Sequence, residues 1–197
     1  MRKRTRPRSR ASFGAALASF ALAVAAAGTA AAVPGAAPAP AADPVYCMGQ
    51  QATVVGTEGQ DFETGTAGND VVALLGGSDT YADAGGDDLV CLGSGNDQMG
   101  ADFAFVTGAD TVDAGPGDDE VFGFDGADTV FGGDGVDRLM GGNGQDDLRG
   151  NAGDDTLKGE GANDSLIGNT GNDNADGGAG TANKCAAESE VNCQLDP

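Results

Sequence analysis

Two adjacent stretches decide the fold of this chain: residues 132–140, which read GGDGVDRLM, and residues 141–149, which read GGNGQDDLR. Each has glycine at its first, second and fourth positions, aspartate at its sixth and leucine at its eighth. Closely spaced glycines favour a turn because glycine adopts backbone conformations that other residues avoid. The three residues after each aspartate are too few for a helix and show no 3.6-residue period, so they indicate a short extended strand.

The same pattern recurs along most of the chain. Every step between neighbouring sixth-position aspartates is nine residues, except the step of thirteen from Asp97 to Asp110. Glycine stands two residues before each aspartate except Asp164, where Ala162 replaces it, and an apolar or aromatic residue follows two positions after all but the last. These aspartates are Asp70, Asp79, Asp88, Asp97, Asp110, Asp119, Asp128, Asp137, Asp146, Asp155, Asp164 and Asp173.

A three-residue strand followed by a six-residue turn, many times repeated, predicts an all-β solenoid of parallel strands. Two nine-residue units complete one coil, so the expected architecture is a parallel β-roll. The eighth position of each unit is predicted to face inward, as at Val112, Val121, Val130, Leu139, Leu148, Leu157 and Leu166. One apolar side chain per nine Gly-rich residues makes a thin core, and apolar burial alone is not expected to hold the fold.

The expected organisation has five parts. Basic residues, an apolar run and small residues ending at Ala32 predict a signal peptide over residues 1–32, and hence a secreted protein. A Pro/Ala-rich linker (33–45) precedes an N-terminal cap with a degenerate repeat around Asp61 (46–64), the β-roll (65–181) and a disulfide-closed tail (182–197). A membrane-anchoring helix is the alternative for the leader. The apolar run is short and the Pro/Ala tract after it is not a stop-transfer flank, so no membrane span is expected once the leader is removed.

Charge narrows the choice of partners. The first ten residues hold six of the ten basic residues, and removing them leaves four basic and 31 acidic residues, a net charge of −27. No basic patch exists outside the leader, so nucleic acid is excluded as a partner. An acidic, Gly-rich chain with few aromatics is usually disordered, and the repeat argues for order only if a cation is present.

Four cysteines, Cys47, Cys91, Cys185 and Cys193, follow the leader. An even count in an exported chain favours disulfides. Order and proximity suggest the pairs Cys47–Cys91 and Cys185–Cys193, one of three possible pairings. A zinc site is disfavoured because the sequence has no CxxC pair and no histidine.

The nonapeptide G-G-x-G-x-D-x-U-x, where U is a large apolar residue, is nearly intact in Gly132–Met140 and Gly141–Arg149. The match to this motif is less complete in Gly150–Lys158, Gly159–Ile167 and Gly168–Asp176. The pattern resembles the hemolysin-type repeats of the calcium-binding repeats-in-toxin (RTX) family, from about Gly56 to Gly180. The resemblance implies several Ca²⁺ ions, each bound between neighbouring turns on the same side of the roll.

Ligand chemistry agrees with this resemblance. Carboxylates and turn carbonyls make an all-oxygen site, which suits calcium better than magnesium because magnesium demands tighter octahedral geometry. All twelve repeat aspartates are predicted metal ligands, although they could instead only cap solvated turns. The resemblance implies that ligands come from units n and n+2, which pairs Asp119 with Asp137 and Asp155, and Asp128 with Asp146 and Asp164.

Departures from the motif are expected to limit the number of calcium sites that are occupied. The four extra residues near Gly100–Ala104 should bulge out and interrupt the row of aspartates after Asp97. Ala182 stands where the next aspartate would fall, so the row is expected to end at Asp173. The best-occupied stretch is predicted to run from Asp119 to Asp164.

The sequence therefore predicts a secreted calcium-binding protein that folds as Ca²⁺ binds and has no catalytic activity of its own. Without histidine, neither a Ser-His-Asp triad nor an HExxH zinc site can form, which makes a hydrolase the least favoured interpretation. The alternative is a calcium-dependent adhesion module for an unknown cell-surface or matrix partner. It rests on an apolar file at Phe122, Phe131 and Met140.

Overall fold

The computed structural model describes residues 43–100 and 106–193. All described residues belong to one compact unit. The predicted signal peptide (1–32), most of the predicted linker (33–45) and the extra residues after Gly100 lie outside the described residues.

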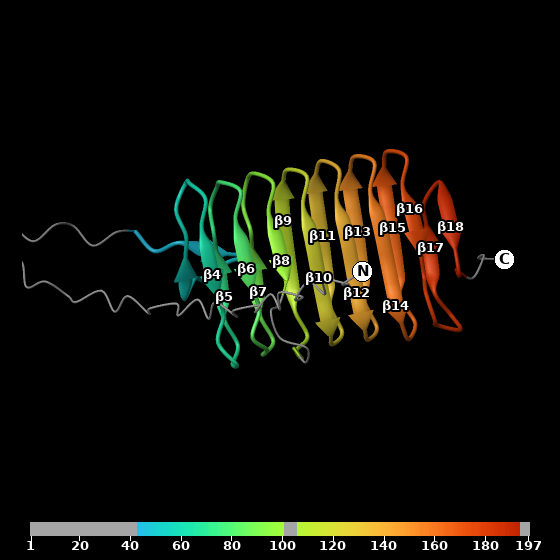
Figure 1. Ribbon diagram of the computed structural model, residues 1–197, viewed down its shortest axis with the longest axis horizontal. Coiled ribbons are helices and arrows are strands. Elements are labelled where there is room, and N and C mark those ends of the chain that lie inside the picture. Colours follow the sequence, from blue (N-terminus) through green and yellow to red (C-terminus); the bar gives the residue numbers. More distant parts are fainter. Residues whose placement is uncertain (1–42, 101–105, 194–197) are drawn as a thin grey trace, which may run out of the picture. The chain divides into compact units, whose positions relative to one another are not determined.

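The described residues form two eight-stranded parallel sheets and one short antiparallel pair. Even-numbered strands β4 to β18 make one sheet and odd-numbered strands β3 to β17 the other, each in sequence order, so the chain alternates between the sheets (Figure 1). The strands are β1 (Tyr46–Cys47), β2 (Gln50–Gln51), β3 (Val54–Val55), β4 (Phe62–Thr64), β5 (Val71–Ala73), β6 (Thr80–Ala82), β7 (Leu89–Cys91), β8 (Gln98–Gly100), β9 (Thr111–Pro116), β10 (Glu120–Asp125), β11 (Thr129–Asp134), β12 (Arg138–Asn143), β13 (Asp147–Ala152), β14 (Thr156–Gly161), β15 (Ser165–Thr170), β16 (Asn174–Asp176), β17 (Lys184–Ala186) and β18 (Ser189–Val191). This confirms the all-β parallel solenoid, with the features of a β-roll.

The register of the strands matches one coil per two units. In the even-strand sheet Val121 pairs with Leu139 and Leu139 with Leu157. The eighth-position side chains are fully buried and stack along the interior, as predicted: Val112, Val121, Val130, Leu139, Leu148, Leu157 and Leu166. The core is therefore a single file of apolar residues between two sheets.

Strand length differs from the prediction in the central coils. Strands β4 to β8 have three residues, as expected, but β9 to β15 have six. In these coils the second-position residue has a positive φ, as at Phe124 (φ 72°), and the chain still pairs with the next coil there, as between Phe124 and Gly142. The prediction of a six-residue turn is wrong there, because residues with turn-like composition still form the interstrand ladder.

Strand pairing continues across the insertion that follows Asp97. Leu89 pairs with Thr111, and Gln98 pairs with Glu120, so the register advances by 22 residues instead of 18 across the insertion. The predicted bulge near Gly100–Ala104 lies almost wholly outside the described residues. On either side of it, Val90 pairs with Val112 and Met99 with Val121, and all four side chains are buried.

Both predicted disulfides are present. Cys47 is joined to Cys91, 44 positions further along the chain, and Cys185 to Cys193. The first links the β1–β2 pair to β7, and on loop entropy alone it stabilises the fold by about 4 kcal/mol. The second closes the loop between β17 and the residues after β18.

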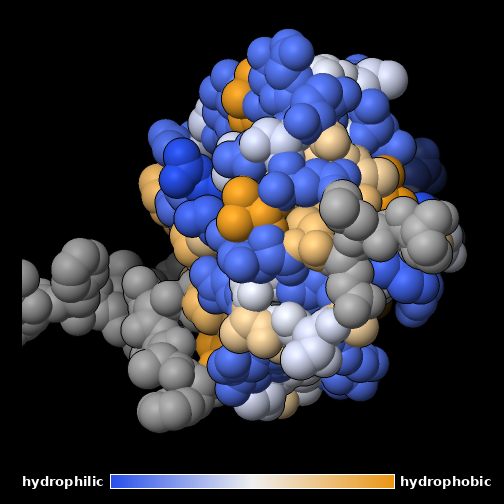
Figure 2. Space-filling model, turned by 90° about the vertical axis from the view of Figure 1, so that its right-hand side faces the viewer, coloured by the Kyte–Doolittle hydropathy of each residue, from blue (hydrophilic) through white to orange (hydrophobic). Residues whose placement is uncertain are grey.

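The surface at the C-terminal end of the roll is mainly hydrophilic, with small separate apolar areas (Figure 2). Over residues 43–100 and 106–193, the structure has no helix with the length and apolar character needed to cross a membrane.

Candidate metal centre

The repeat aspartates form two rows. Each row runs along one sheet, at the N-terminal ends of its strands. In the even row the aspartates immediately precede even-numbered strands: Asp61, Asp79, Asp97, Asp119, Asp137, Asp155 and Asp173. In the odd row they immediately precede odd-numbered strands: Asp70, Asp88, Asp110, Asp128, Asp146 and Asp164. All twelve predicted ligands are buried, and Asp61, in the degenerate first unit, is half-buried.

One carboxylate oxygen of each aspartate joins adjacent coils. The backbone N–H of Asp119 donates to Oδ1 of Asp137, and the N–H of Asp137 donates to Oδ1 of Asp155. The same bond, at 2.7–3.1 Å, links every consecutive pair in both rows, including Asp88 to Asp110 and Asp97 to Asp119 across the insertion. The neighbours implied by the resemblance are therefore adjacent in space.

The second carboxylate oxygen, Oδ2, is buried without a hydrogen-bond partner in ten of the twelve predicted ligands. These are Asp79, Asp97, Asp110, Asp119, Asp128, Asp137, Asp146, Asp155, Asp164 and Asp173. Burying a charged oxygen without a donor is costly, so each of these carboxylates needs either a proton or a cation.

Glycine at the first position of the unit keeps a small space open beside this oxygen. A Cβ placed on Gly123 would lie 2.5 Å from Oδ2 of Asp128 and 2.7 Å from the carbonyl oxygen of Gly141, in the next coil. Gly132 and Gly150 have the equivalent two neighbours, the Oδ2 of the aspartate in their own unit and the carbonyl oxygen of the first glycine in the next coil. A carboxylate and a carbonyl thus face one space, and an all-oxygen donor set of this kind fits Ca²⁺.

The carboxylates are too evenly spaced to form a compact acidic cluster. Among the described residues, no group of three or more acidic or cysteine side chains gathers closely enough to hold a metal ion by itself. Backbone carbonyls therefore have to supply much of the coordination, which is consistent with the open turns and with the flexible coordination of Ca²⁺.

The pKa values of these carboxyl groups are raised. Burial, aided by neighbouring carboxylates, raises the pKa of Asp110, Asp119 and Asp128 to about 7. The same causes raise the pKa of Asp137 and Asp146 to about 6. Without a cation, the central part of each row therefore resists full ionisation near neutral pH.

The model of the RTX calcium-binding nonapeptide repeat (4 copies) matches residues 53–82, 83–99, 106–139, 140–175 and 158–181. The chain belongs to this RTX family. It is therefore a calcium-binding repeat protein, and its buried, unpartnered carboxylate oxygens lie within the matched repeats. No curated protein and no solved structure shows significant similarity to it.

Hydrogen-bond donors at the N-terminal end of this RTX roll were not foreseen from the sequence. Oδ2 of Asp70 accepts hydrogen bonds from the backbone N–H and the hydroxyl of Thr66. Oδ2 of Asp88 accepts one from the hydroxyl of Tyr81. The sequence held two signals for these donors. One was the threonine four residues before the aspartate, and the other was the tyrosine at an inward position.

Two side chains at the C-terminal end were also missed. Asn183 continues the odd row one residue later than the repeat predicts, and its Oδ1 accepts the N–H of Asp164 at 2.9 Å. Its amide nitrogen donates to the carbonyl oxygens of Gly177 and Asn192. Glu188 continues the even row by accepting the N–H of Asp173. The rows therefore extend one coil beyond the predicted end at Asp173.

Asp83 is a further buried acidic residue. It occupies the first position of its unit, where most central and C-terminal units have glycine, and is fully buried. Its Oδ1 accepts the N–H of Gly85, while its Oδ2 has no partner. An acidic residue at a glycine position was the sequence signal for this departure from the motif.

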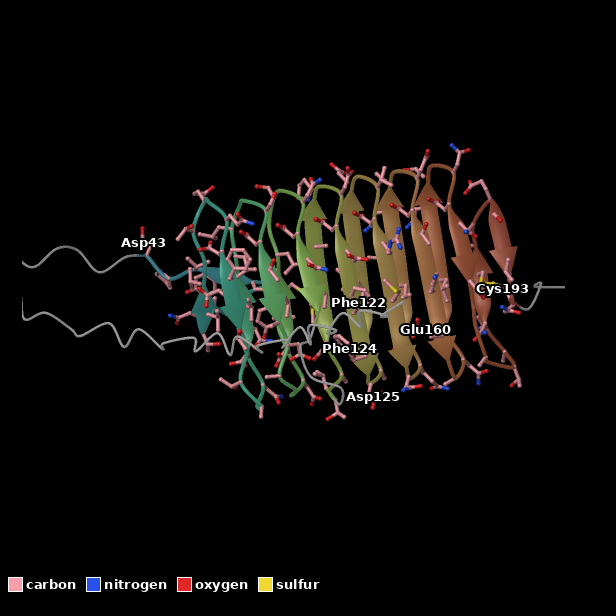
Figure 3. All side chains as sticks on the ribbon, in the orientation of Figure 1. Asp43, Phe122, Phe124, Asp125, Glu160 and Cys193 are labelled. Atoms are coloured by element: carbon pink, nitrogen blue, oxygen red, sulfur yellow. A yellow bond between two sulfur atoms is a disulfide. The ribbon has the colours of Figure 1, made fainter. Side chains whose placement is uncertain are left out.

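A second set of side chains joins the coils outside the two rows. At the fifth position of the unit, the side-chain oxygen accepts the N–H of the equivalent residue, or its neighbour, one coil later. The acceptors are Asn69, Asp87, Asn96, Asp118, Asp154 and Asn163. Figure 3 shows the resulting oxygen-rich side chains along both turn edges of the roll. These bonds run opposite to those of the buried rows and need no metal.

Proposed function

We propose that this RTX protein is exported and folds into its β-roll as several Ca²⁺ ions bind between successive coils. One observation carries the proposal: ten buried aspartate oxygens stand in two rows without a donor. Bound calcium would neutralise these carboxylates, and without it they repel one another. Metal binding and folding are therefore expected to be coupled.

All twelve repeat aspartates remain our predicted ligands, and the ten with an unpartnered Oδ2 are the strongest. Support for shared sites comes from neighbours one coil apart, such as Asp119 and Asp137, whose carboxylates line the same row. The carbonyl of the first glycine in the next coil, as at Gly141 beside Asp128, is the accompanying donor.

Export is supported by the basic-apolar-small leader and by the two disulfides, which persist in oxidising compartments. We keep the five proposed segments: signal peptide (1–32), linker (33–45), cap (46–64), roll (65–181) and tail (182–197). The β-roll, with its short turns and acidic surface, suits a chain that completes its folding only when it meets extracellular calcium.

We assign no catalytic activity to the chain, on the ground that its sequence contains no histidine. The three apolar residues considered for adhesion do not favour an adhesive function. Phe122 and Met140 lie on the even-strand sheet and Phe131 on the odd-strand sheet. The ring of Phe122 stacks on Phe124 (Figure 3), and Arg149 lies over the ring of Phe131, so these aromatics have partners within the roll.

Calcium titration of the disulfide-intact protein tests the proposal. Circular dichroism of the whole chain should show much less β structure in EDTA than in millimolar Ca²⁺, the range in which weak extracellular calcium modules bind. The same concentration of Mg²⁺ should not. Spectra and calorimetric heats unchanged by Ca²⁺ would refute calcium-coupled folding.

A further inference from the structure

We propose that the N-terminal coils, from β1 to β7, fold without calcium and form the template on which the calcium-binding coils assemble. This inference rests on the proposed function, because it divides the roll into a segment held by protein groups and one held by metal. It gives folding a direction, from the N-terminal end of the roll toward its C-terminal end.

Threonine donors replace a cation in the first two units. The N–H and hydroxyl of Thr57 donate to Oδ2 of Asp61, at 2.6 and 3.0 Å. Thr66 makes the same two bonds to Oδ2 of Asp70, at 2.6 and 2.9 Å. Later units have no threonine at this position, and their carboxylates have no such donor.

Tyr81 satisfies the next carboxylate of the odd row. The tyrosine occupies an inward position, is fully buried, and donates its hydroxyl hydrogen to Oδ2 of Asp88 at 3.1 Å. The first member of the odd row with an unpartnered Oδ2 is therefore Asp110. Within the described residues, every odd-row aspartate before the insertion is satisfied by protein donors.

The N-terminal coils also have a larger apolar core. Leu74 and Leu92 occupy the first position of their units and are fully buried, together with Val72 and Val90. From Gly123 onward this position is glycine, and each unit contributes one inward apolar side chain. In the units of Asp79 and Asp97, the first-position leucine is buried in addition to the eighth-position side chain, Tyr81 or Met99, and this extra apolar burial stabilises the coil.

A covalent link completes this segment. The Cys47–Cys91 disulfide joins its two ends, and Cys47, in β1, is fully buried. Asp79 and Asp83 are the carboxylates between β1 and β7 whose Oδ2 is buried without a partner, whereas nine such groups follow from Asp97 to Asp173. The need for a cation is therefore concentrated after the disulfide-linked segment.

Hydrogen exchange followed by mass spectrometry tests the template directly. In EDTA, with the disulfides intact, peptides from residues 54–92 should exchange at least about tenfold more slowly than peptides from residues 119–175. Added Ca²⁺ should then protect the second group. Equal, fast exchange of both groups in EDTA would overturn the template. A failure of Ca²⁺ to protect residues 119–175 would instead overturn the proposed function.

Two variants test whether the protein donors hold the template, as distinct from a general loss of stability. Thr66→Val and Tyr81→Phe each remove one donor hydroxyl, and should speed exchange of residues 54–92 in EDTA and raise the calcium midpoint for residues 119–175. Thr156→Val, on the strand β14 in the calcium-binding part, is the matched control and should leave residues 54–92 unchanged. If Thr66→Val and Tyr81→Phe behave as the control does, the protein donors do not hold this segment and the proposal fails.

Discussion

The backbone N–H of Asp119 donates to Oδ1 of Asp137, 2.9 Å away in the next coil, while Oδ2 of Asp137 is buried with no donor. One carboxylate therefore has two roles in this fold. Its first oxygen fixes the spacing between coils, and its second is left for a cation. Repetition of this arrangement along both rows makes the stability of the roll depend on calcium.

Replacing Asp137 by asparagine should affect the metal-free and calcium-bound states in opposite directions. Asp137→Asn keeps an oxygen to accept the N–H of Asp119 but removes the buried charge. It should stabilise the metal-free roll by about 1–3 kcal/mol, while lowering the number of bound Ca²⁺ ions by at least one. Urea unfolding and calorimetric titration measure the two effects. Asp134→Asn, an exposed change of equal charge in the same turn, should do neither.

The space beside Oδ2 should not tolerate a methyl group. Gly132→Ala would place Cβ against Oδ2 of Asp137 and 2.8 Å from the carbonyl oxygen of Gly150. We expect a severalfold increase in the calcium midpoint by circular dichroism. Gly68→Ala is the control, since its Cβ would meet nothing closer than Thr66 Oγ1 at 3.9 Å. Equal midpoints for the two variants would show that the space beside Gly132 holds no ligand.

Asn183 is the last residue of the odd row, and its neutral side chain needs no cation. Replacing it by aspartate should make this position dependent on a bound cation. Asn183→Asp removes the amide donor to the carbonyls of Gly177 and Asn192 and adds a buried charge. In EDTA the variant should lose about 1–3 kcal/mol of stability, with most of the loss recovered in Ca²⁺. Thermal unfolding in each buffer measures this. The exposed change Asn174→Asp should have little effect in either buffer, and a loss that calcium does not reduce would contradict the prediction.

Acid should partly substitute for calcium. Burial raises the pKa of Asp119 and Asp128 to about 7, above the unfolded value of about 3.9. The folded state therefore binds more protons than the unfolded state between about pH 4 and 7, and the stability of the metal-free roll rises as pH falls through this range. Circular dichroism in EDTA should show more β structure at about pH 5 than at pH 8.

Protons and calcium compete for the same carboxylates, so the calcium midpoint should rise as pH falls from 8 to about 5.5. Titrations at the two pH values measure this shift. A calcium midpoint that is independent of pH would mean that the carboxyl groups with raised pKa values are not at the calcium sites.

The repeat spacing predicted the coil and the inward residues, and the resemblance to the RTX family implied the adjacency of Asp119 with Asp137. The coil and the inward residues depend on two nine-residue units per coil, a period that is broken only at the insertion. The length of β9 to β15 was not predictable from composition, because glycine pairs that signal turns also pair between coils in this fold. The continuity of the ladder across the insertion depends on strand pairing, which the spacing of Asp97 and Asp110 does not reveal.

The ends of the roll were the least predictable part of the site. The sequence indicated that the rows should stop near Asp173, but Asn183 and Glu188 each continue a row by one coil. Neither side chain stands at the nine-residue interval, so the period alone could not identify them. The donors Thr66 and Tyr81 were visible in the sequence, but which carboxylate oxygen they satisfy depends on side-chain direction.

The most direct test of the account is a crystal structure of the calcium-bound protein with anomalous diffraction recorded to locate Ca²⁺. We predict anomalous peaks between successive coils, beside the Oδ2 atoms of the odd row from Asp110 to Asp164 and of the even row from Asp119 to Asp155. The weakest peaks are expected beside Oδ2 of Asp70 and Asp88, which already accept hydrogen bonds from protein donors. Calcium found only on exposed carboxylates, with these Oδ2 atoms still unliganded, would contradict the central claim.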